Sequence, residues 1–529
     1  MDGSTALHTI ATTQLKLDTV VVTAAQMQAI ESRLFAAGMP VAALMEKVAG
    51  LVADWVQARY PLADNARIGV LVGPGHNGGD ALVVARELWL NGYEVQVYQP
   101  FEQVKELTQH HGQYACHLGI PSVMQVSDLA HCHVLIDGLF GFGLTRDLSG
   151  AVAEGVAQIN QGSQPVVSID VPSGLHTDTG EVLGVALRAT QTLCLGLWKL
   201  GLLQEQALPY VGQVERIDFG IPEADVMAVL GQSPACQRIT TRAAMAAGRS
   251  LTIAALPLSR PINTHKYRQG HLLMVGGSQT YSGSILLAAL GAKATGVGML
   301  SVAVPESLKP GLVAQIPDAL VIGCPETQQG AIARLPDGFD LRHFQAIAYG
   351  PGVTCETDAV LHQLWHCECP LVLDADGLNL LAQLGTVPQL QKRQSATILT
   401  PHLGEFKGLF PAVSAPCHTG LAQIAAQQSG AWVLLKGART VVANPEGRVW
   451  INPESTPALA RGGSGDVLTG VLGGTLAQFS EADLSAPVCS AVWWHAQAGI
   501  WAAQQRTVMG VDALTLAHSL IPALTHWQA

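Results

Sequence analysis

Residues 67–90, RIGVLVGPGHNGGDALVVARELWL, join a β-rich apolar run to a glycine-rich turn and then to a helical pattern. The run RIGVLVG (67–73) is almost continuously apolar, which is typical of a strand buried on both faces of a parallel sheet. The pattern that follows predicts a helix from Asp80 to Leu90. A strand, a turn and a helix in this order are the repeating unit of a doubly wound α/β sheet.

The same alternation extends in both directions from this unit. Before it, apolar residues at three- and four-residue steps predict two amphipathic helices, one starting at Thr23 and one following Pro40. After it, apolar runs separated by helical segments predict a parallel sheet that is covered on both faces. The further strands are expected at 94–99, 133–140, 165–170 and 192–197, with a helix through 102–118.

The alternation lapses around residues 221–262 and then resumes with a second set of strands. We therefore predict two doubly wound α/β domains, at 1–225 and 260–529, joined by a junction at 226–259. The length of 529 residues agrees, because single cores stop growing at roughly 250–300 residues. The second set of strands is expected at 271–277, 299–305, 319–324, 346–352, 370–377, 396–402 and 432–437, followed by a β-hairpin at 440–453.

Composition narrows the class of function. Apolar residues are 48% of the chain and charged ones 13%, which argues against a disordered chain, a coiled coil and a charge-driven scaffold. The net charge of −11, with no basic stripe, argues against binding to nucleic acid or to an anionic membrane. The ten cysteines are scattered and are expected to be reduced core thiols. With no signal peptide and no long unbroken apolar segment, we expect a cytoplasmic homo-oligomer that binds small molecules.

The first glycine-rich loop is GPGHNGGD, residues 73–80, between a predicted strand and a predicted helix. Backbone N–H groups at the start of a helix favour an anion, so a phosphate group is the expected ligand. The loop matches neither the G-x-G-x-x-G dinucleotide fingerprint nor the phosphate-binding loop that ends in G-K-[ST]. The alternative is a tight turn that places Asp80 in the first helical turn.

Two more oxygen-rich loops follow predicted strands of the first domain. IDGLFGFGL (136–144) places Asp137 at a strand end, and SIDVPSGL (168–175) does the same with Asp170 and nearby Ser173. The carboxyl ends of parallel strands meet at one edge of the sheet. All three loops are therefore expected to form one site.

The strongest motif of the second half is RGGSGDVLTGVLGG, residues 461–474. The backbone amides of residues 462–465 can neutralise a transferring phosphoryl group while Asp466 takes a proton from an attacking hydroxyl. The alternative is a flexible Gly-Ser linker, but the helical period of DVLTGVL argues against it.

The three loops of the first half resemble those of the NAD(P)H-hydrate epimerase family, over about residues 20–220. The resemblance implies potassium ligands at Asn77, Asp137 and Ser173, and an acid/base role for Asp170 at the reacting carbon. Such oxygen ligands suit a hard cation. The residues implied to hold the hydrated nucleotide are His76, Asn77, Gly78, Gly79, Asp80, Gly141, Phe142, Gly143, Leu144, Thr145, Arg146, Asp147 and Asp170.

The 461–474 motif resembles the anion hole and catalytic base of the ribokinase-like superfamily, and six other motifs narrow it to the ADP-dependent NAD(P)H-hydrate dehydratases over 260–529. The resemblances together imply an N-terminal Rossmann-like three-layer sandwich and a C-terminal ribokinase-like domain. The six motifs are HKYRQGH (265–271), GGSQTYSGS (276–284), YGPG (349–352), LDADGLN (373–379), TPHLGEF (400–406) and LKGART (435–440).

Matching positions carry roles over to the second half. Glu405 stands at the place of the superfamily's magnesium-organising glutamate. The substrate position Ser284 departs from the usual Ala of the family, as His76 departs from Asn and Trp198 from a Pro that precedes the lysine matched by Lys199. The implied substrate residues are Ser284, Gly352, His402 and Asp466, and the implied ADP residues are Lys436, Gly437, Ala438, Arg439, Thr440 and Gly465.

The resemblance implies a repair enzyme for hydrated NADH and NADPH (NADHX and NADPHX), with K⁺, Mg²⁺ and ADP. The first domain would interconvert the R and S forms at C6, and the second would use ADP to dehydrate the S form, giving NAD(P)H, AMP and phosphate. Phosphate leaves far more easily than hydroxide, which makes the second step chemically sensible.

Several alternatives stay open. The second half could be a kinase of a small alcohol, such as a thiamine precursor. The chain could instead be a non-catalytic nucleotide-binding scaffold, although the presence of Asn77, Asp170 and Asp466 argues against that. Asp374 and Asp376 could belong to the site or could only shape a turn.

Overall fold

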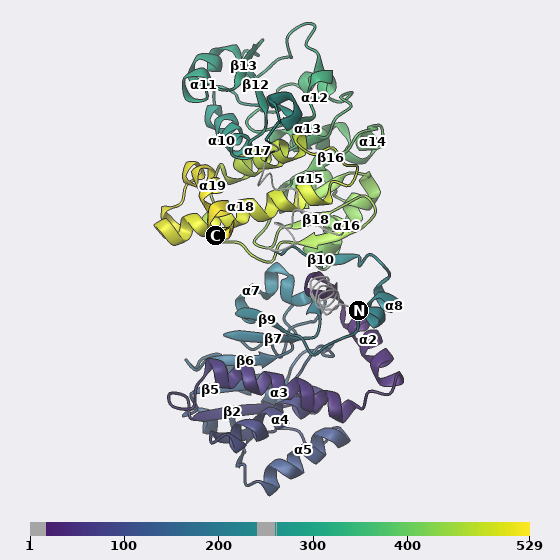
Figure 1. Ribbon diagram of the computed structural model, residues 1–529, viewed down its shortest axis with the longest axis vertical. Coiled ribbons are helices and arrows are strands. Elements are labelled where there is room, and N and C mark those ends of the chain that lie inside the picture. Colours follow the sequence, from purple (N-terminus) through teal and green to yellow (C-terminus); the bar gives the residue numbers. More distant parts are fainter. Residues whose placement is uncertain (1–16, 241–259, 261, 529) are drawn as a thin grey trace. The chain divides into compact units, whose positions relative to one another are not determined.

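The computed structural model describes residues 17–240, 260 and 262–528. The chain forms two compact units, Met1–Cys236 and Gln237–Ala529, each with its own large sheet (Figure 1). The division lies in the segment 226–259, which was expected to be a junction; residues 241–259 of that segment lie outside the described residues. Both units have α/β architecture, so the predicted fold class is confirmed.

The first unit contains a seven-stranded parallel sheet with the order β4-β3-β2-β5-β6-β7-β9. The chain runs outward from β2 to β4 and then returns to the other side of β2 as β5. The strand order therefore reverses between β2 and β5, which is where open α/β sheets bind ligands. The strands are β2 (Arg67–Val72), β3 (Glu94–Tyr98), β4 (Ser122–Val123), β5 (Val134–Gly138), β6 (Val166–Ile169), β7 (Gln191–Leu195) and β9 (Gln213–Ile217).

Helices cover both faces of this sheet, as expected for a three-layer sandwich. Val70 of β2 belongs to the core shared with the helices on one face, whereas its neighbour Leu71 belongs to a separate core on the other face. The two helices expected before β2 are confirmed as α2 and α3, and Thr23 caps α2 with a capping box. The helices are α2 (Ala24–Ala36), α3 (Val41–Arg59), α4 (His76–Leu90), α5 (Glu106–His117), α6 (Gly150–Ile159), α7 (Leu208–Val211) and α8 (Glu223–Leu230).

The start of α4 differs from the prediction. The helix begins at His76 instead of Asp80. The expected start was too late because the HNGG segment has a low helix propensity. Close packing explains the glycines: a Cβ atom at Gly78 would lie 2.0 Å from the Gly73 carbonyl oxygen, and one at Gly79 would lie 2.7 Å from Met45 Cε. The loop residues expected to surround an anion are therefore part of the first turns of the helix.

A short two-stranded sheet joins distant parts of the first unit. β1 (Val21–Val22) pairs in parallel with β8 (Trp198–Lys199), and Val22 lies opposite Lys199. Because β1 directly precedes α2, this pairing places α2 beside Lys199.

The second unit contains a ten-stranded sheet with the order β10-β19-β18-β17-β16-β15-β14-β11-β12-β13. The strands from β11 to β17 pair in parallel, and the hairpin predicted at 440–453 is confirmed as antiparallel β18 and β19. The strands are β10 (Cys236–Arg238), β11 (His271–Val275), β12 (Met299–Pro305), β13 (Leu320–Cys324), β14 (Ala346–Tyr349), β15 (Leu371–Leu373), β16 (Thr397–Leu399), β17 (Trp432–Leu435), β18 (Val441–Ala443) and β19 (Val449–Ile451).

The helix α17 lies in the middle of the core of this unit. It packs closely on α10, because Gly470 has no Cβ; such an atom would lie 1.8 Å from the Ala288 carbonyl oxygen. The helices are α10 (Ser282–Ala294), α11 (Lys309–Gln315), α12 (Ala359–Leu364), α13 (Asp376–Leu384), α14 (Thr386–Leu390), α15 (Leu403–Leu409), α16 (His418–Ser429), α17 (Ser464–Ala477), α18 (Ser485–Arg506) and α19 (Ala513–Gln528).

Two expectations about the whole chain are tested by these elements. Within 17–240 and 262–528, no helix is both long enough and apolar enough to span a membrane. All ten cysteines are free, but Cys116 and Cys355 are exposed, so the expectation that every cysteine is a core thiol was wrong.

Candidate functional site

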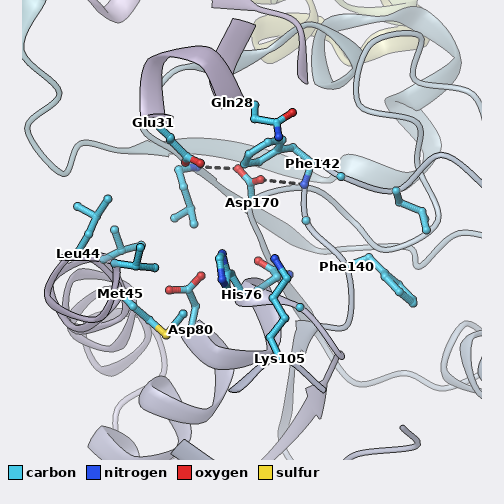
Figure 2. Close-up of a pocket in the computed structure, with 18 of the residues that line it drawn as sticks. Gln28, Glu31, Leu44, Met45, His76, Asp80, Lys105, Phe140, Phe142 and Asp170 are labelled. Atoms are coloured by element: carbon cyan, nitrogen blue, oxygen red, sulfur yellow. Dashed lines mark hydrogen bonds between the residues drawn. The ribbon is translucent and has the colours of Figure 1, made fainter. Parts of the chain in front are cut away.

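The first unit contains a cavity of about 840 Å³. It lies beyond the carboxyl ends of β2, β5 and β6, with α2 and α3 as its other wall (Figure 2). This is the switch point of the sheet, the usual ligand site of the architecture. The predicted site residues that line the cavity are His76, Asn77, Asp80, Gly141, Phe142, Gly143, Leu144, Thr145, Arg146 and Asp170.

Other predicted residues of this site lie outside the cavity wall. Gly78 and Gly79 are buried and pack α4 against its neighbours. Asp147 is exposed and is not among the lining residues of the described chain. Asp137 and Ser173 are buried behind the wall, where they contact each other.

Asp170 is the most constrained residue of the cavity. It follows β6 with a left-handed backbone (φ 71°) that is unfavourable for a residue with a side chain. Its carboxylate accepts hydrogen bonds at 3.2 Å from the N–H groups of Phe142 and Leu195, and it lies 2.5 Å from Lys199 Nζ. Burial lowers the pKa of Lys199, but the charges of Asp170, Cys194 and Glu31, together with a hydrogen bond to Asp170, outweigh burial and hold that pKa above its ordinary value. Asp170 and Lys199 therefore form a buried ion pair.

Asp137 is the centre of a buried oxygen cluster. It accepts hydrogen bonds from the Ser168 hydroxyl at 2.8 Å, from the Ser173 hydroxyl at 2.6 Å and from the Ser173 N–H at 2.9 Å. Burial raises its pKa, and these donors partly offset the increase. No described basic side chain forms an ion pair with it, and the amide nitrogen of nearby Asn77 is buried without a hydrogen-bond partner among the described residues. A buried carboxylate with no basic partner among the described residues suits a cation, to which Asn77 would contribute its amide oxygen, since the amide nitrogen is a donor.

Two further carboxyl groups face the cavity. Burial raises the pKa of Glu31 to about 7, although the charge of Lys199 opposes the increase. Burial also raises the pKa of Asp80 well above its ordinary value, and the charges of Asp170 and Glu31 add to that increase. At neutral pH, Glu31 is therefore divided between its protonated and ionised forms.

Sequence reasoning missed Gln28, Glu31, Ser32 and Lys105 of this cavity wall, and it also missed the role of Lys199. The sequence gives only a weak indication that Glu31 belongs to the site: it is an acidic residue directly after Ile30, which is one of the buried apolar residues of α2. Lys199 lies in β8, outside the three loops that the sequence pointed to. Its position beside α2 becomes clear from the pairing of β8 with β1.

The structure shows the surroundings of two positions that were expected to depart from the family pattern. His76 is the first residue of α4, and burial together with the charge of Lys105 lowers its pKa, so it is neutral at pH 7. Trp198 is buried in β8 opposite Val21.

In the second unit, Asp466 lies in the first turn of α17. The helix follows Gly463, whose backbone is left-handed (φ 90°) and whose added Cβ would lie 2.6 Å from Leu287 Cδ1. Burial raises the pKa of Asp466 to about 7, the charge of Asp374 adds to this, and a hydrogen bond with the Ser284 side chain opposes it. Because α17 is a buried helix, the flexible-linker alternative is excluded.

Asp374 is part of this site and not only a turn residue. It is 2% exposed and accepts hydrogen bonds from Thr400 at 2.8 Å, Thr469 at 2.6 Å and Lys436 at 2.8 Å. Burial raises its pKa, but the Lys436 charge and these donors outweigh burial and hold the pKa below its ordinary value. Lys436 thus lies in a buried ion pair beside Gly465.

The neighbouring Asp376 shapes a turn instead. Its carboxylate accepts a hydrogen bond from Thr354 N at 3.2 Å, next to the YGPG motif. Within that motif Gly352 has φ 71°, and a Cβ there would lie 2.8 Å from the Tyr281 carbonyl oxygen. Asp376 therefore fixes the loop that carries the predicted substrate residue Gly352.

His402 and Glu405 form the capping box of α15. His402 Nδ1 accepts hydrogen bonds from Gly404 N at 3.0 Å and Glu405 N at 3.2 Å, while Glu405 accepts from His402 N at 2.8 Å. Glu405 also lies 3.9 Å from Lys436 Nζ, and burial raises its pKa. The structure brings both residues to the edge of the Asp374 cluster.

The predicted nucleotide segment 436–440 begins at this cluster and leads outward to exposed Gly437 and Ala438. Arg439 is half-buried, and no described residue accepts a hydrogen bond from its Nε. Burial lowers its pKa to about 10, so it stays charged at pH 7. A buried, unused donor on a cation suits an anionic ligand.

His495 of α18 is a residue that sequence reasoning missed. Its Nε2–H donates to the Ser464 carbonyl oxygen at 2.9 Å, at the start of α17. Burial lowers its pKa to about 4, so it is neutral. This hydrogen bond holds the glycine-rich segment at the start of α17 in place.

Each unit thus presents buried acid–base groups at the carboxyl edge of a parallel sheet, which defines the class of α/β enzymes with two active sites. Residues 272–522 match the NAD(P)H-hydrate dehydratase family, and residues 41–201 match the family described as YjeF-related protein N-terminus.

Full-length relatives cover both halves. The bifunctional NAD(P)H-hydrate repair enzyme Nnr of Synechocystis sp. is 53% identical over 96% of this chain and 95% of its own length. The enzyme of the same name from Thermosynechococcus vestitus is 53% identical over 95% of this chain and 97% of its own. The chain belongs to the family of bifunctional NAD(P)H-hydrate repair enzymes.

A solved structure, the ADP/ATP-dependent NAD(P)H-hydrate dehydratase from Bacillus subtilis co-crystallized with ATP/Mg²⁺, is similar to part of the chain. It is 30% identical, with a TM-score of 0.43, and the match covers 51% of this chain and 94% of that one.

Proposed function

We propose that this protein repairs hydrated NADH and NADPH at two active sites. The first unit interconverts the R and S forms at C6, and the second dehydrates the S form with ADP to give NAD(P)H, AMP and phosphate. The observation that carries the proposal is Asp466, a carboxyl group with a pKa of about 7 at the glycine-rich start of α17, in a chain 53% identical over 96% of its length to the Synechocystis repair enzyme.

In the second unit, Asp466 takes the proton of the C6 hydroxyl as that oxygen attacks the terminal phosphorus of ADP. A pKa near the working pH suits a general base. The N–H groups at the start of α17 neutralise charge on the transferring group. The phosphate ester then leaves with its electron pair, assisted by the lone pair of the ring nitrogen. Ser284, Gly352 and His402 hold the substrate.

The nucleotide is held by the segment that follows β17, with Gly465 on the other side. Lys436 supplies a fixed positive charge and Arg439 an unused buried donor. ADP is the proposed phosphoryl donor. The residues assigned to it are Lys436, Gly437, Ala438, Arg439, Thr440 and Gly465.

Glu405 is the residue that would organise Mg²⁺ in the second unit. Its carboxyl group lies at the edge of the Asp374 cluster, 3.9 Å from Lys436 Nζ. Burial raises its pKa despite the charge of Lys436, so a hard cation bound there would stabilise its ionised form. When bound, Mg²⁺ offsets the charge of the nucleotide phosphates.

In the first unit, Asp170 removes the proton of the C6 hydroxyl. The ammonium of Lys199, 2.5 Å away, holds the Asp170 carboxylate in place. Asn77, Asp137 and Ser173 would hold K⁺ through their side-chain oxygens, which is supported by the buried Asp137 carboxyl group that has no basic partner among the described residues. When bound, K⁺ fixes the three loops and offsets the charge of Asp137.

The test is to incubate a mixture of NADHX epimers with purified protein, Mg²⁺ and ADP, and to follow the absorbance of the restored dihydronicotinamide. Complete conversion of both epimers is expected, with AMP and free phosphate as products. ATP in a parallel reaction is expected to support a much slower rate. A phosphorylated product without NADH would favour a kinase of a small alcohol, and no reaction at all would favour a non-catalytic scaffold.

A further inference from the structure

Glu31 extends from α2 into the cavity of the first unit, on the wall opposite the strand ends. Figure 2 shows Glu31 beside Asp170, with Asp80 and His76 from α4 farther across the cavity. The β1–β8 pairing fixes this position, because it ties the start of α2 to the strand that carries Lys199. No described residue donates a hydrogen bond to the Glu31 carboxyl group, so its proton is free to move.

Asp170 has the opposite character. Its carboxylate accepts two backbone hydrogen bonds and lies 2.5 Å from the ammonium of Lys199. All three contacts are with donors, so Asp170 acts as the hydrogen-bond acceptor in the cavity. In the proposed reaction it takes a proton, and a different group has to supply one.

The charges around Glu31 make it the complementary group. Two charged groups act on its carboxyl group: Lys199 favours the ionised form and Asp170 disfavours it, while Asp80 and neutral His76 lie farther across the cavity. Burial raises the pKa of Glu31 to about 7. Near neutral pH the cavity thus holds a fixed base and an acid with an available proton.

We propose that Glu31 is a second catalytic residue of the epimerase site, where it donates a proton to the ring nitrogen of the hydrated nicotinamide. The inference rests on the proposed function. Asp170 takes the proton of the C6 hydroxyl, the C6=O double bond forms, and the C6–N1 bond breaks with its electron pair on N1. The Glu31 carboxyl group protonates N1, which gives a neutral open-chain aldehyde.

Reversal of these steps gives the other epimer. Rotation about the C5–C6 bond presents the opposite face of the aldehyde to N1. N1 then attacks C6, the N1 proton returns to Glu31, and the carbonyl oxygen takes the proton back from Asp170. Atoms and electrons balance within the substrate and two carboxyl groups, without any co-substrate.

The experiment measures interconversion of the purified S and R forms, without ADP, in wild type, Glu31→Gln and Glu31→Asp. Glu31→Gln is expected to lower kcat at least ~10²-fold, because the amide cannot donate the proton, with KM changed only a few-fold. The wild-type rate is expected to fall as pH rises through about 7, where Glu31 loses its proton. Glu31→Asp keeps a carboxyl group and is expected to keep this fall at a reduced rate.

Glu154→Gln is the matched control, since Glu154 lies exposed on α6 and does not line the cavity. It is expected to keep the wild-type rate. ADP-dependent dehydration of the S form by each variant shows that the chain is folded.

Retention of more than a tenth of the wild-type rate in Glu31→Gln would overturn the proposal, as would an unchanged pH profile in that variant. If Glu31→Gln fails to fold, loss of the fall above pH 7 in folded Glu31→Asp would overturn it and its persistence would support it. An inactive wild type would instead contradict the proposed function of the first unit.

Discussion

The Ser284 side chain of α10 hydrogen-bonds the carboxyl group of Asp466 on α17. The two helices meet here because glycines in α17 let them approach closely. The bond favours the ionised form of Asp466, against burial and the charge of Asp374, which both favour the protonated form. The Ser284 hydroxyl thus adjusts the pKa of the proposed base.

Dehydration should depend on pH through Asp466. A general base works in its ionised form, so kcat/KM for the S form is expected to rise as pH increases through about 7. Ser284→Ala removes a hydrogen bond that lowers the pKa of Asp466 and is expected to move the midpoint of this rise to higher pH. The measurement is kcat/KM between pH 5.5 and 9 for both proteins. A flat wild-type profile, or a midpoint that Ser284→Ala leaves in place, would contradict the role of this pair.

Asp466→Asn is expected to lower the rate of dehydration at least ~10²-fold, since an amide cannot accept the hydroxyl proton. Epimerisation in the other unit should keep the wild-type rate, which provides the control for folding. Both rates are measured on the same purified protein. More than a tenth of the wild-type dehydration rate in the variant would show that Asp466 is not the base.

Asp374→Asn is expected to destabilise the second unit by about 3 kcal/mol, because it removes the nearest charged partner of the Lys436 ammonium, at 2.8 Å, and leaves Glu405 at 3.9 Å. The measurement is the free energy of unfolding in denaturant. Asp318→Asn is the matched control: Asp318 also pairs with a lysine, at 2.7 Å, but its side chain is 64% exposed. That pair is expected to contribute less than about 1 kcal/mol. Equal effects of the two substitutions would refute the structural role of Asp374.

Potassium is expected to speed epimerisation, because the oxygen cluster around Asp137 holds a buried carboxylate to which no basic side chain of the described residues is paired. Asp137→Ala should lose this activation, whereas Asp170→Ala should lose epimerisation in any salt. The rate of interconversion is compared in K⁺ and in a bulky organic cation at equal ionic strength, with ADP omitted. Equal rates in the two salts would remove the cation site and leave the role of Asp170 standing.

The strands could be predicted well from the sequence, because strands that are buried on both faces of a parallel sheet consist of continuous apolar runs. MLSVAVP, for example, is β12 over its full predicted length, Met299–Pro305. The start of α4 was predicted badly, since Gly78 and Gly79 have poor helix propensity and are needed for packing. Local preference was overridden by a tertiary contact that no local pattern records.

The residues of the candidate sites also fall into two groups, those that could be predicted from the sequence and those that could not. Residues in glycine-rich loops at strand ends, such as Asp170 and Asp466, could be predicted from their immediate neighbours. Glu31 and Lys199 could not, because they meet Asp170 only through the pairing of β1 with β8. His495 is a further case, since it reaches the start of α17 from the opposite side of the core.

The strand β10 determines where this chain can be divided into two separate enzymes. It forms the outer edge of the second sheet, and Ile239 directly after it is fully buried and bonds through its N–H to the Ile451 carbonyl oxygen at 2.8 Å. A fragment that starts at residue 260 would leave β19 as a bare edge, which invites aggregation, and would lose the burial of Ile239. An isolated dehydratase therefore needs its first residue placed ahead of Cys236.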